Sequence, residues 1–174
     1  MNAAGLHARD VSCALGVEPS RLPPRWMAKG AYFALPTGRR PFSRLVHPMP
    51  EDGGLGIHYT VDVRGGARFG PSVEWLPAGT EPDALSYAVD PSHVDRFRHA
   101  VRGYFPGVES EDLLPEFSGA RPKVAGPGEG FVDFCIHGPE DHGGASLVCL
   151  YGIESPGLTS CMALASHVVQ KLTR

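Results

Sequence analysis

The sequence predicts an α+β fold with a mainly antiparallel or mixed sheet and a few helices. Apolar segments of strand length outnumber the helical ones, and the two kinds do not alternate regularly, as they would around a parallel sheet. The 22 glycines and 17 prolines imply many turns and long connections. Hydrophobic residues make up 42% of the chain and charged residues 20%, so we expect a globular chain that buries a core.

The first predicted element is a short helix over residues 5–16. Its apolar face would consist of Ala8, Val11 and Leu15, and Gly16 would end it. A loop with three prolines follows over residues 17–29. The N-terminal segment is therefore expected to pack a single helix face against the rest of the chain.

Strands are predicted next, at residues 30–35 and 43–50. Clean alternation over residues 57–63 predicts a further strand, and Arg64-Gly65-Gly66 would turn the chain into a returning strand at 67–70. In this hairpin the apolar side chains face one side and the polar ones the other.

The C-terminal half begins with the clearest helix. Asp90 would cap it and Pro91 suits its first position; its apolar stripe comprises Val94, Phe97, Val101, Tyr104 and Phe105. Strands are then expected at 113–123, 131–137 and 145–151. A final helix after Ser155-Pro156 would carry an apolar face made of Cys161, Leu164, Ala165, Val168 and Leu172.

Composition argues against several classes of function. A net charge of -3 gives no basic patch of the kind that binds nucleic acid. No apolar run approaches the ~20 residues that span a bilayer, and the first residues lack the pattern of a signal peptide. The expected location is the cytoplasm. The four cysteines have no C-x-x-C spacing, and His137 and His142 flank turn-forming residues, so no metal site is expected.

Two turns stand out because small residues connect a strand position to a helix. The first is Asn2-Ala3-Ala4-Gly5-Leu6, and the second covers residues 152–160. Glycine lets the backbone approach a ligand closely, and a helix N-terminus offers free N–H groups and a partial positive charge. Taken singly, each turn is better explained by tight packing, and the first could also be a frayed terminus.

Several motifs occur in one order along nearly the whole chain. They are the turn 2–6, residues 41–45 with Pro48-Met49-Pro50, residues 54–58, residues 68–71, Arg121-Pro122-Lys123 and residues 152–159. This ordered set resembles the D-amino-acid-oxidase-like superfamily of FAD-dependent oxidoreductases, in particular the branch that contains L-2-hydroxyglutarate dehydrogenase. The resemblance implies the substrate-binding domain of such an enzyme, with remnants of its FAD domain.

One feature of that superfamily is absent. Its members begin with a strand, a G-x-G-x-x-G turn and a helix that hold the FAD pyrophosphate, and this sequence contains no such motif. We therefore expect a C-terminal half: residues 1–29 as an FAD-domain remnant, 30–144 as the substrate-binding domain, and 145–174 as a strand and helix that return to the FAD domain. FAD is the implied cofactor of the intact enzyme, and this chain alone is not expected to bind it.

The resemblance also assigns candidate site residues. Cofactor contacts would come from Ala4, Gly5, Gly152, Ile153, Glu154, Ser155, Pro156, Gly157, Leu158 and Thr159. Arg121, with Lys123 on the same face of the strand and Thr60 in the hairpin, would bind a substrate carboxylate; a surface ion pair is the alternative for Arg121. His58 would act as a base toward a hydroxy acid or orient it; a solvated or hydrogen-bonded histidine is the alternative.

Two functions follow as expectations. The first is the C-terminal part of an enzyme that oxidises a 2-hydroxy acid, similar to L-2-hydroxyglutarate, or an amino acid by hydride transfer to FAD. The second is a stand-alone, non-catalytic binding module descended from such an enzyme. The expected partners are a small carboxylate substrate and either a second copy of the chain or the absent FAD-binding half.

Overall fold

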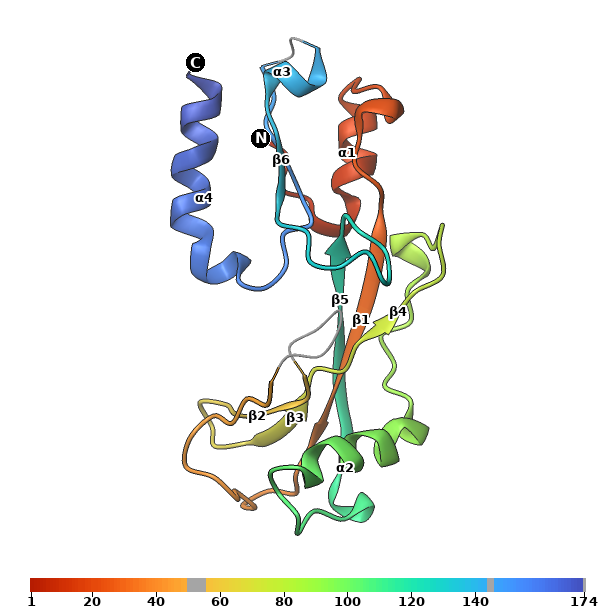
Figure 1. Cartoon of the computed structure of the whole chain (residues 1–174), viewed down its shortest axis with the longest axis vertical. Coiled ribbons are helices and arrows are strands. Elements are labelled where there is room, and N and C mark those ends of the chain that lie inside the picture. Colours follow the sequence, from red (N-terminus) through yellow and green to blue (C-terminus); the bar gives the residue numbers. More distant parts are fainter. Residues whose placement is uncertain (50–55, 144–145, 174) are drawn as a thin grey trace. The chain divides into compact units, whose positions relative to one another are not determined.

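The computed structural model describes residues 1–49, 56–143 and 146–173 and divides the chain into two compact units (Figure 1). Unit 1 contains Met1–Ala28, Leu76–Leu85 and Ala120–Arg174, and unit 2 contains Lys29–Trp75 and Ser86–Gly119. Antiparallel strand pairs with a few helices confirm the predicted α+β class. The predicted assignment of residues 1–29, 30–144 and 145–174 to functional domains stays a prediction.

The larger sheet has five strands in the order β2-β3-β1-β4, with β5 beside β1. Their bounds are Trp26–Ala34 (β1), His58–Val61 (β2), Ala67–Gly70 (β3), Glu74–Trp75 (β4) and Leu114–Lys123 (β5). Short 3-10 turns occupy Gly5–His7, Pro19–Arg21, Pro82–Ala84, Pro91–His93 and Ser110–Asp112. β1 begins at Trp26, within the segment predicted as a loop, and so starts four residues before the predicted strand.

The predicted hairpin of unit 2 is confirmed. His58 pairs with Gly70 and Val61 with Ala67 across β2 and β3. The turn forms because Asp62 Oδ1 accepts hydrogen bonds from the backbone N–H groups of residues 64 and 66 at 2.8 and 2.9 Å. These hydrogen bonds stabilise the charged carboxylate, so they lower the pKa of Asp62.

The predicted capped helix is also confirmed. Asp90 accepts a hydrogen bond from the backbone N–H of Ser92 at 2.8 Å and caps the 3-10 turn Pro91–His93, which continues into α2 (Val94–Arg102). Phe97, in the middle of the helix, is fully buried, and its ring centroid lies 4.4 Å from that of Phe33 in β1. This contact places α2 on the sheet and forms the core of unit 2 (Figure 1).

The strand predicted at residues 43–50 does not form over 43–49, and Pro50 lies outside the described residues. Val46 and Tyr59 exchange two backbone hydrogen bonds, at 2.8 and 3.2 Å, as an isolated bridge. Pro48 has no N–H group to donate, so the ladder cannot extend past it. The segment therefore forms one isolated bridge and no strand over residues 43–49.

Unit 1 is built on a two-stranded antiparallel sheet flanked by helices. Its elements are α1 (Ala8–Ala14), β6 (Cys135–His137), α3 (Pro139–His142), β7 (Cys149–Tyr151) and α4 (Gly157–Leu172). Both strands are shorter than predicted: Phe131 is 92% exposed and precedes β6, and residue 145 lies outside the described residues.

The predicted burial of β7 is confirmed, and its alternation explains the layers of unit 1. Cys149 and Tyr151 pack in a cluster with Ala8 of α1. Val148, just before β7, and Leu150 pack instead with Val168 of α4. Successive side chains of a strand point to opposite faces, so α1 and α4 cover opposite faces of β7, as Figure 1 shows.

Only part of the predicted apolar face of each helix is buried. In α1 the buried residues are Ala8 and Ser12, whereas Val11 is 36% exposed and Leu15, just beyond its end, 56%. In α4, Val168 is buried as expected, but Cys161, Ala165 and Leu172 are exposed and Leu164 is only partly covered. Ser12 is buried although it is polar, because its hydroxyl has hydrogen-bond partners on β7. Hydrophobicity alone therefore does not determine which face of α1 is buried.

Candidate functional site

A small pocket, open to solvent, lies within unit 1. Residues from four segments line it: 5–9 of the first turn and helix, 23–27 at the start of β1, 122–124 at the end of β5, and 151–152 at the end of β7. These segments are distant in sequence, yet both of the turns singled out by the sequence contribute a glycine. The pocket is therefore the candidate functional site.

Both pocket glycines adopt backbone conformations that favour glycine. Gly5 has φ +58° and Gly152 has φ +67°. A Cβ at Gly152 would lie 3.1 Å from a Val124 methyl, and a Cβ at Gly5 would meet no atom within 4 Å. The first glycine thus leaves open space beside the backbone, and the second allows close packing at the pocket wall.

The first turn is anchored, so the alternative of a frayed terminus is wrong. Asn2 is 3% exposed, and its backbone N–H donates to the carbonyl of Val148 at 2.8 Å. Its side-chain amide donates to the carbonyl of Ala8 at 2.7 Å and to Ser12 Oγ at 2.9 Å. Asn2 thus fixes the turn that carries Ala4 and Gly5.

The second turn leads into α4 without a side-chain cap. Pro156 occupies the position before the helix, and Gly157 N–H donates to the carbonyl of Glu154 at 2.5 Å. The N–H groups of Leu158 and Thr159 have no hydrogen-bond partner among the described residues. The start of a 16-residue helix therefore presents donors and a partial positive charge.

Two predicted substrate cations lie at the end of β5. Lys123 lines the pocket, and its Nζ lies 2.6 Å from Glu154 Oε1. Arg121 is two residues earlier, and one of its terminal nitrogens is buried without a hydrogen-bond partner among the described residues. Residues two apart on a strand share a face, so a guanidinium with unused donors lies on the face that carries Lys123.

The other two predicted residues belong to unit 2. His58 and Thr60 are both in β2. His58 is 6% exposed and its ring stacks on that of His47, with centroids 4.2 Å apart. The burial of His58 excludes a solvated side chain, and its role as a base or orienting residue stays a prediction. Within unit 1 the structure brings together the two turns and Lys123, whereas His58 and Thr60 belong to unit 2.

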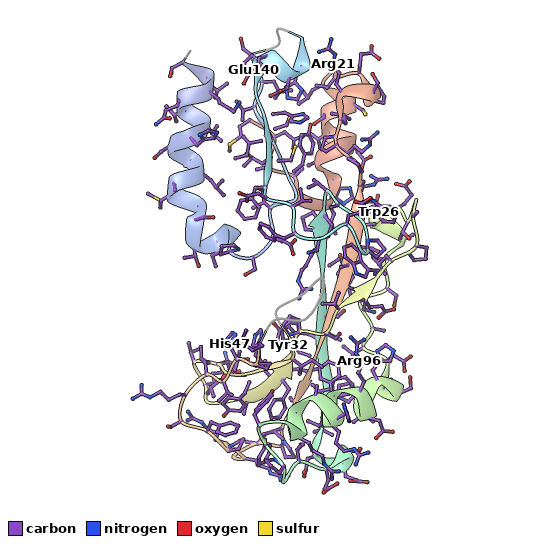
Figure 2. All side chains as sticks on the ribbon, in the orientation of Figure 1. Arg21, Trp26, Tyr32, His47, Arg96 and Glu140 are labelled. Atoms are coloured by element: carbon purple, nitrogen blue, oxygen red, sulfur yellow. The ribbon has the colours of Figure 1, made fainter. Side chains whose placement is uncertain are left out.

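Sequence analysis missed the pocket wall formed by residues 23–27. Trp26, labelled in Figure 2, lies against Gly126, where a Cβ would approach the indole to 2.8 Å. Arg9 donates to the carbonyls of residues 22 and 23 at 3.1 and 2.6 Å. A tryptophan directly after two prolines and an arginine was an available signal, but the segment was interpreted only as a connecting loop.

The two histidines that raised the question of a metal lie close together. The ring centroids of His137 and His142 are 5.6 Å apart. Over residues 1–49, 56–143 and 146–173, no group of three or more potential ligands is placed to hold a metal ion. The same ranges contain no helix that is long and apolar enough to cross a membrane.

Comparison with known proteins identifies the family. The FAD dependent oxidoreductase family (DAO) matches residues 1–171. The chain is 42% identical, over 180 residues, to "L-2-hydroxyglutarate dehydrogenase, mitochondrial" of Arabidopsis thaliana, a match that covers 100% of this chain and 37% of that protein. It therefore spans little more than a third of this relative.

A solved structure shares the fold. The dithionite-reduced L-alpha-glycerophosphate oxidase from Mycoplasma pneumoniae, with FAD bound, matches with a TM-score of 0.77 and 21% identity over 99% of this chain and 42% of that one. The fold, the pocket between two glycine turns and the family match over nearly the whole sequence lead to one conclusion. The chain belongs to the family of FAD dependent oxidoreductases.

Proposed function

We propose that unit 1 supplies the flavin-facing site of an FAD-dependent oxidoreductase that acts on a 2-hydroxy acid. Residues 152–159 would face the flavin ring system, and Ala4 and Gly5 would lie nearer its adenosine side. The observation that carries this proposal is the pocket that both Gly5 and Gly152 line. Two turns that are almost 150 residues apart in the printed sequence thus open onto one space.

The residues present fit such a cofactor. Gly5 has no side chain, and a Cβ at this position would meet no atom within 4 Å. A flat ring could therefore approach the backbone. The N–H groups of Leu158 and Thr159 could donate to polar atoms of the ring, and Trp26 offers an aromatic wall. When bound, FAD would supply the chemistry by accepting a hydride.

The substrate would be a small carboxylate, and the chain's own residues would bind and orient it. A guanidinium can hold a carboxylate through two parallel hydrogen bonds, and Arg121 has an unused buried donor for this purpose. Lys123, on the same face of β5, would add a second cation. The name of the Arabidopsis relative supports L-2-hydroxyglutarate as the substrate class.

A titration tests the flavin-facing pocket. Trp75→Phe leaves Trp26 as the single tryptophan, since the sequence has two, and Trp26 lines the pocket. We expect riboflavin to quench Trp26 saturably. Because the sequence lacks G-x-G-x-x-G, binding should be weak, and the purified chain should carry no stoichiometric FAD. Quenching that rises linearly without saturation would contradict the proposal.

A matched pair of glycine variants locates the binding. Gly5→Leu places a side chain into the pocket and should weaken riboflavin binding several-fold. Gly128→Leu is the control, because Gly128 also has a positive φ and open space beside it but does not line the pocket. Equal losses in both variants would mean that backbone strain, rather than pocket filling, causes the effect.

A non-catalytic binding module is the second candidate. The observation in its favour is the apolar surface of α4, where Leu158 is 90% exposed and Met162 79%. Exposed apolar patches of this kind are often covered by a partner. A chain without saturable riboflavin binding that nevertheless associates through α4 would support this function. The cytoplasmic location stays a prediction, and the Arabidopsis relative is named as mitochondrial.

A further inference from the structure

Lys123, which lines the pocket, forms an ion pair with Glu154, two residues after the pocket residue Gly152. The Nζ–Oε1 distance is 2.6 Å, and the side chains are only 17% and 21% exposed. Lys123 ends β5, whereas Glu154 lies in the turn that leads from β7 into α4. The pair therefore joins the strand that carries the predicted substrate cations to the turn that carries the predicted cofactor contacts.

The other cations of the pocket have different partners. Arg25 is matched by two carboxylates, Asp10 and Glu81, each at 2.7 Å. Arg9 bonds to backbone carbonyls of the 19–23 segment. Arg9 keeps its positive charge, Arg25 is balanced by carboxylates, and the charge of Lys123 is balanced by Glu154.

We propose that Glu154 is a positioning residue for Lys123, acting as its internal counter-ion in place of a ligand carboxylate. Glu154 holds the ammonium group at the pocket wall and cancels its charge until an anionic group enters. Lys123 then meets that group without moving far, because it is already oriented. The identification of the anion as a substrate carboxylate rests on the proposed function.

This role differs from that of a purely structural ion pair in the sign of its effects. Glu154→Gln keeps the shape of the side chain and makes the pocket more positive by one charge. Lys123→Met keeps most of the apolar stem and makes it more negative. A structural pair would lose stability in both variants alike, whereas a pair that sets the pocket charge must shift the local potential in opposite directions.

Collisional quenching of Trp26 measures that potential directly. In the Trp75→Phe background, quenching by the iodide anion depends on the local charge around Trp26. Quenching by neutral acrylamide depends only on how accessible Trp26 is. We expect the ratio of the iodide to the acrylamide quenching constant to rise about 1.5- to 2-fold in Glu154→Gln and to fall by a similar factor in Lys123→Met. The double variant should return to the starting ratio. Glu154→Asp and Lys123→Arg should keep it.

A second Lys–Glu pair in unit 1 provides the matched control. Lys171 Nζ and Glu140 Oε1 are 2.5 Å apart, and neither residue lines the pocket. Lys171→Met and Glu140→Gln should leave the quenching ratio unchanged. Equal ratios in all variants, with far-UV circular dichroism unchanged, would overturn the proposal, as would shifts of the same sign in the two single variants.

Binding of glutarate, a plain dicarboxylate, tests the ligand class. Glu154→Gln should bind glutarate several-fold more tightly, because Glu154 no longer competes with glutarate for Lys123. Lys123→Met should bind it more weakly, because the cation is lost. Quenching shifts of the expected sign without any riboflavin binding would leave the ion-pair role intact and remove the flavin site. Riboflavin binding without those shifts would retain the flavin site and remove the role of Glu154.

Discussion

The hydroxyl groups of Ser12 and Tyr151 lie 2.6 Å apart, joining a helix to a strand 139 residues further along the chain. Both residues are buried, and Ser12 Oγ also contacts the Asn2 amide at 2.9 Å. Burial raises the pKa of Tyr151, so the phenol stays neutral and hydrogen-bonded. This network connects the two pocket turns, because Asn2 precedes Gly5 and Tyr151 precedes Gly152.

Removal of the serine hydroxyl should therefore destabilise unit 1. Ser12→Ala leaves both the Tyr151 hydroxyl and the Asn2 amide short of a partner, and we expect a loss of about 1–3 kcal/mol of unfolding free energy. Tyr151→Phe should cost less, since Ser12 keeps its bond to the carbonyl of Ala8 at 2.8 Å. Urea unfolding would measure both. Ser166→Ala, on the exposed side of α4, is the control, and a loss there as large as in Ser12→Ala would contradict the network.

Unit 1 should lose stability in mild acid because of His142. This side chain is 9% exposed and neither ring nitrogen has a hydrogen-bond partner among the described residues. Burial, and then the nearby His137, lowers the pKa of His142 below its ordinary 6.5. As the pH falls below 6.5, the unfolded chain takes up a proton that the folded chain resists, so stability decreases until the pH reaches the folded pKa.

A histidine variant isolates this effect. His142→Gln should flatten the decline of the melting temperature between neutral and mildly acidic pH, measured by circular dichroism. His167→Gln, on the exposed face of α4, should leave the decline as it is. An unchanged pH dependence in His142→Gln would show that another group controls acid stability.

Arg121 should bind the substrate carboxylate through its forked geometry. Arg121→Lys keeps the charge but loses the two parallel donors, so we expect binding of L-2-hydroxyglutarate to weaken by about 1–3 kcal/mol. Isothermal titration of the chain would measure it. Arg21→Lys is the control because Arg21 is exposed and bonds to the carbonyl of Asp141 outside the pocket. Equal affinity in the wild type and Arg121→Lys would remove Arg121 from the site.

The chain should associate, or bind a hydrophobic dye, through α4. Leu158, Met162 and Val169 are 90%, 79% and 59% exposed, and apolar patches on soluble monomers tend to be covered by a partner. Light scattering should show a dimer, since identical patches pair about a two-fold axis. Replacing the three residues with serine should yield a monomer with less dye binding. A wild-type monomer that binds no dye would contradict the expectation.

Local signals predicted much of the fold. Asp90 and Pro91 marked the start of a helix, and Asp62 with the glycines after it formed the hairpin turn, because both features depend on hydrogen bonds to residues only two to four positions away. Predictions failed where contacts with residues distant in sequence determined the structure. The segment around Val46 had strand-like residues but found only one bridge, to Tyr59.

The sequence by itself determined the family resemblance, the α+β class and the two glycine turns, because these depend on the order and chemical type of residues along the chain. Only the tertiary structure decided that Gly5 and Gly152 open onto one pocket, that Trp26 forms its wall, and that Lys123 pairs with Glu154. These relationships join segments that the sequence separates widely. They arise from packing around β7, and no local pattern encodes which distant side chains the packing brings together.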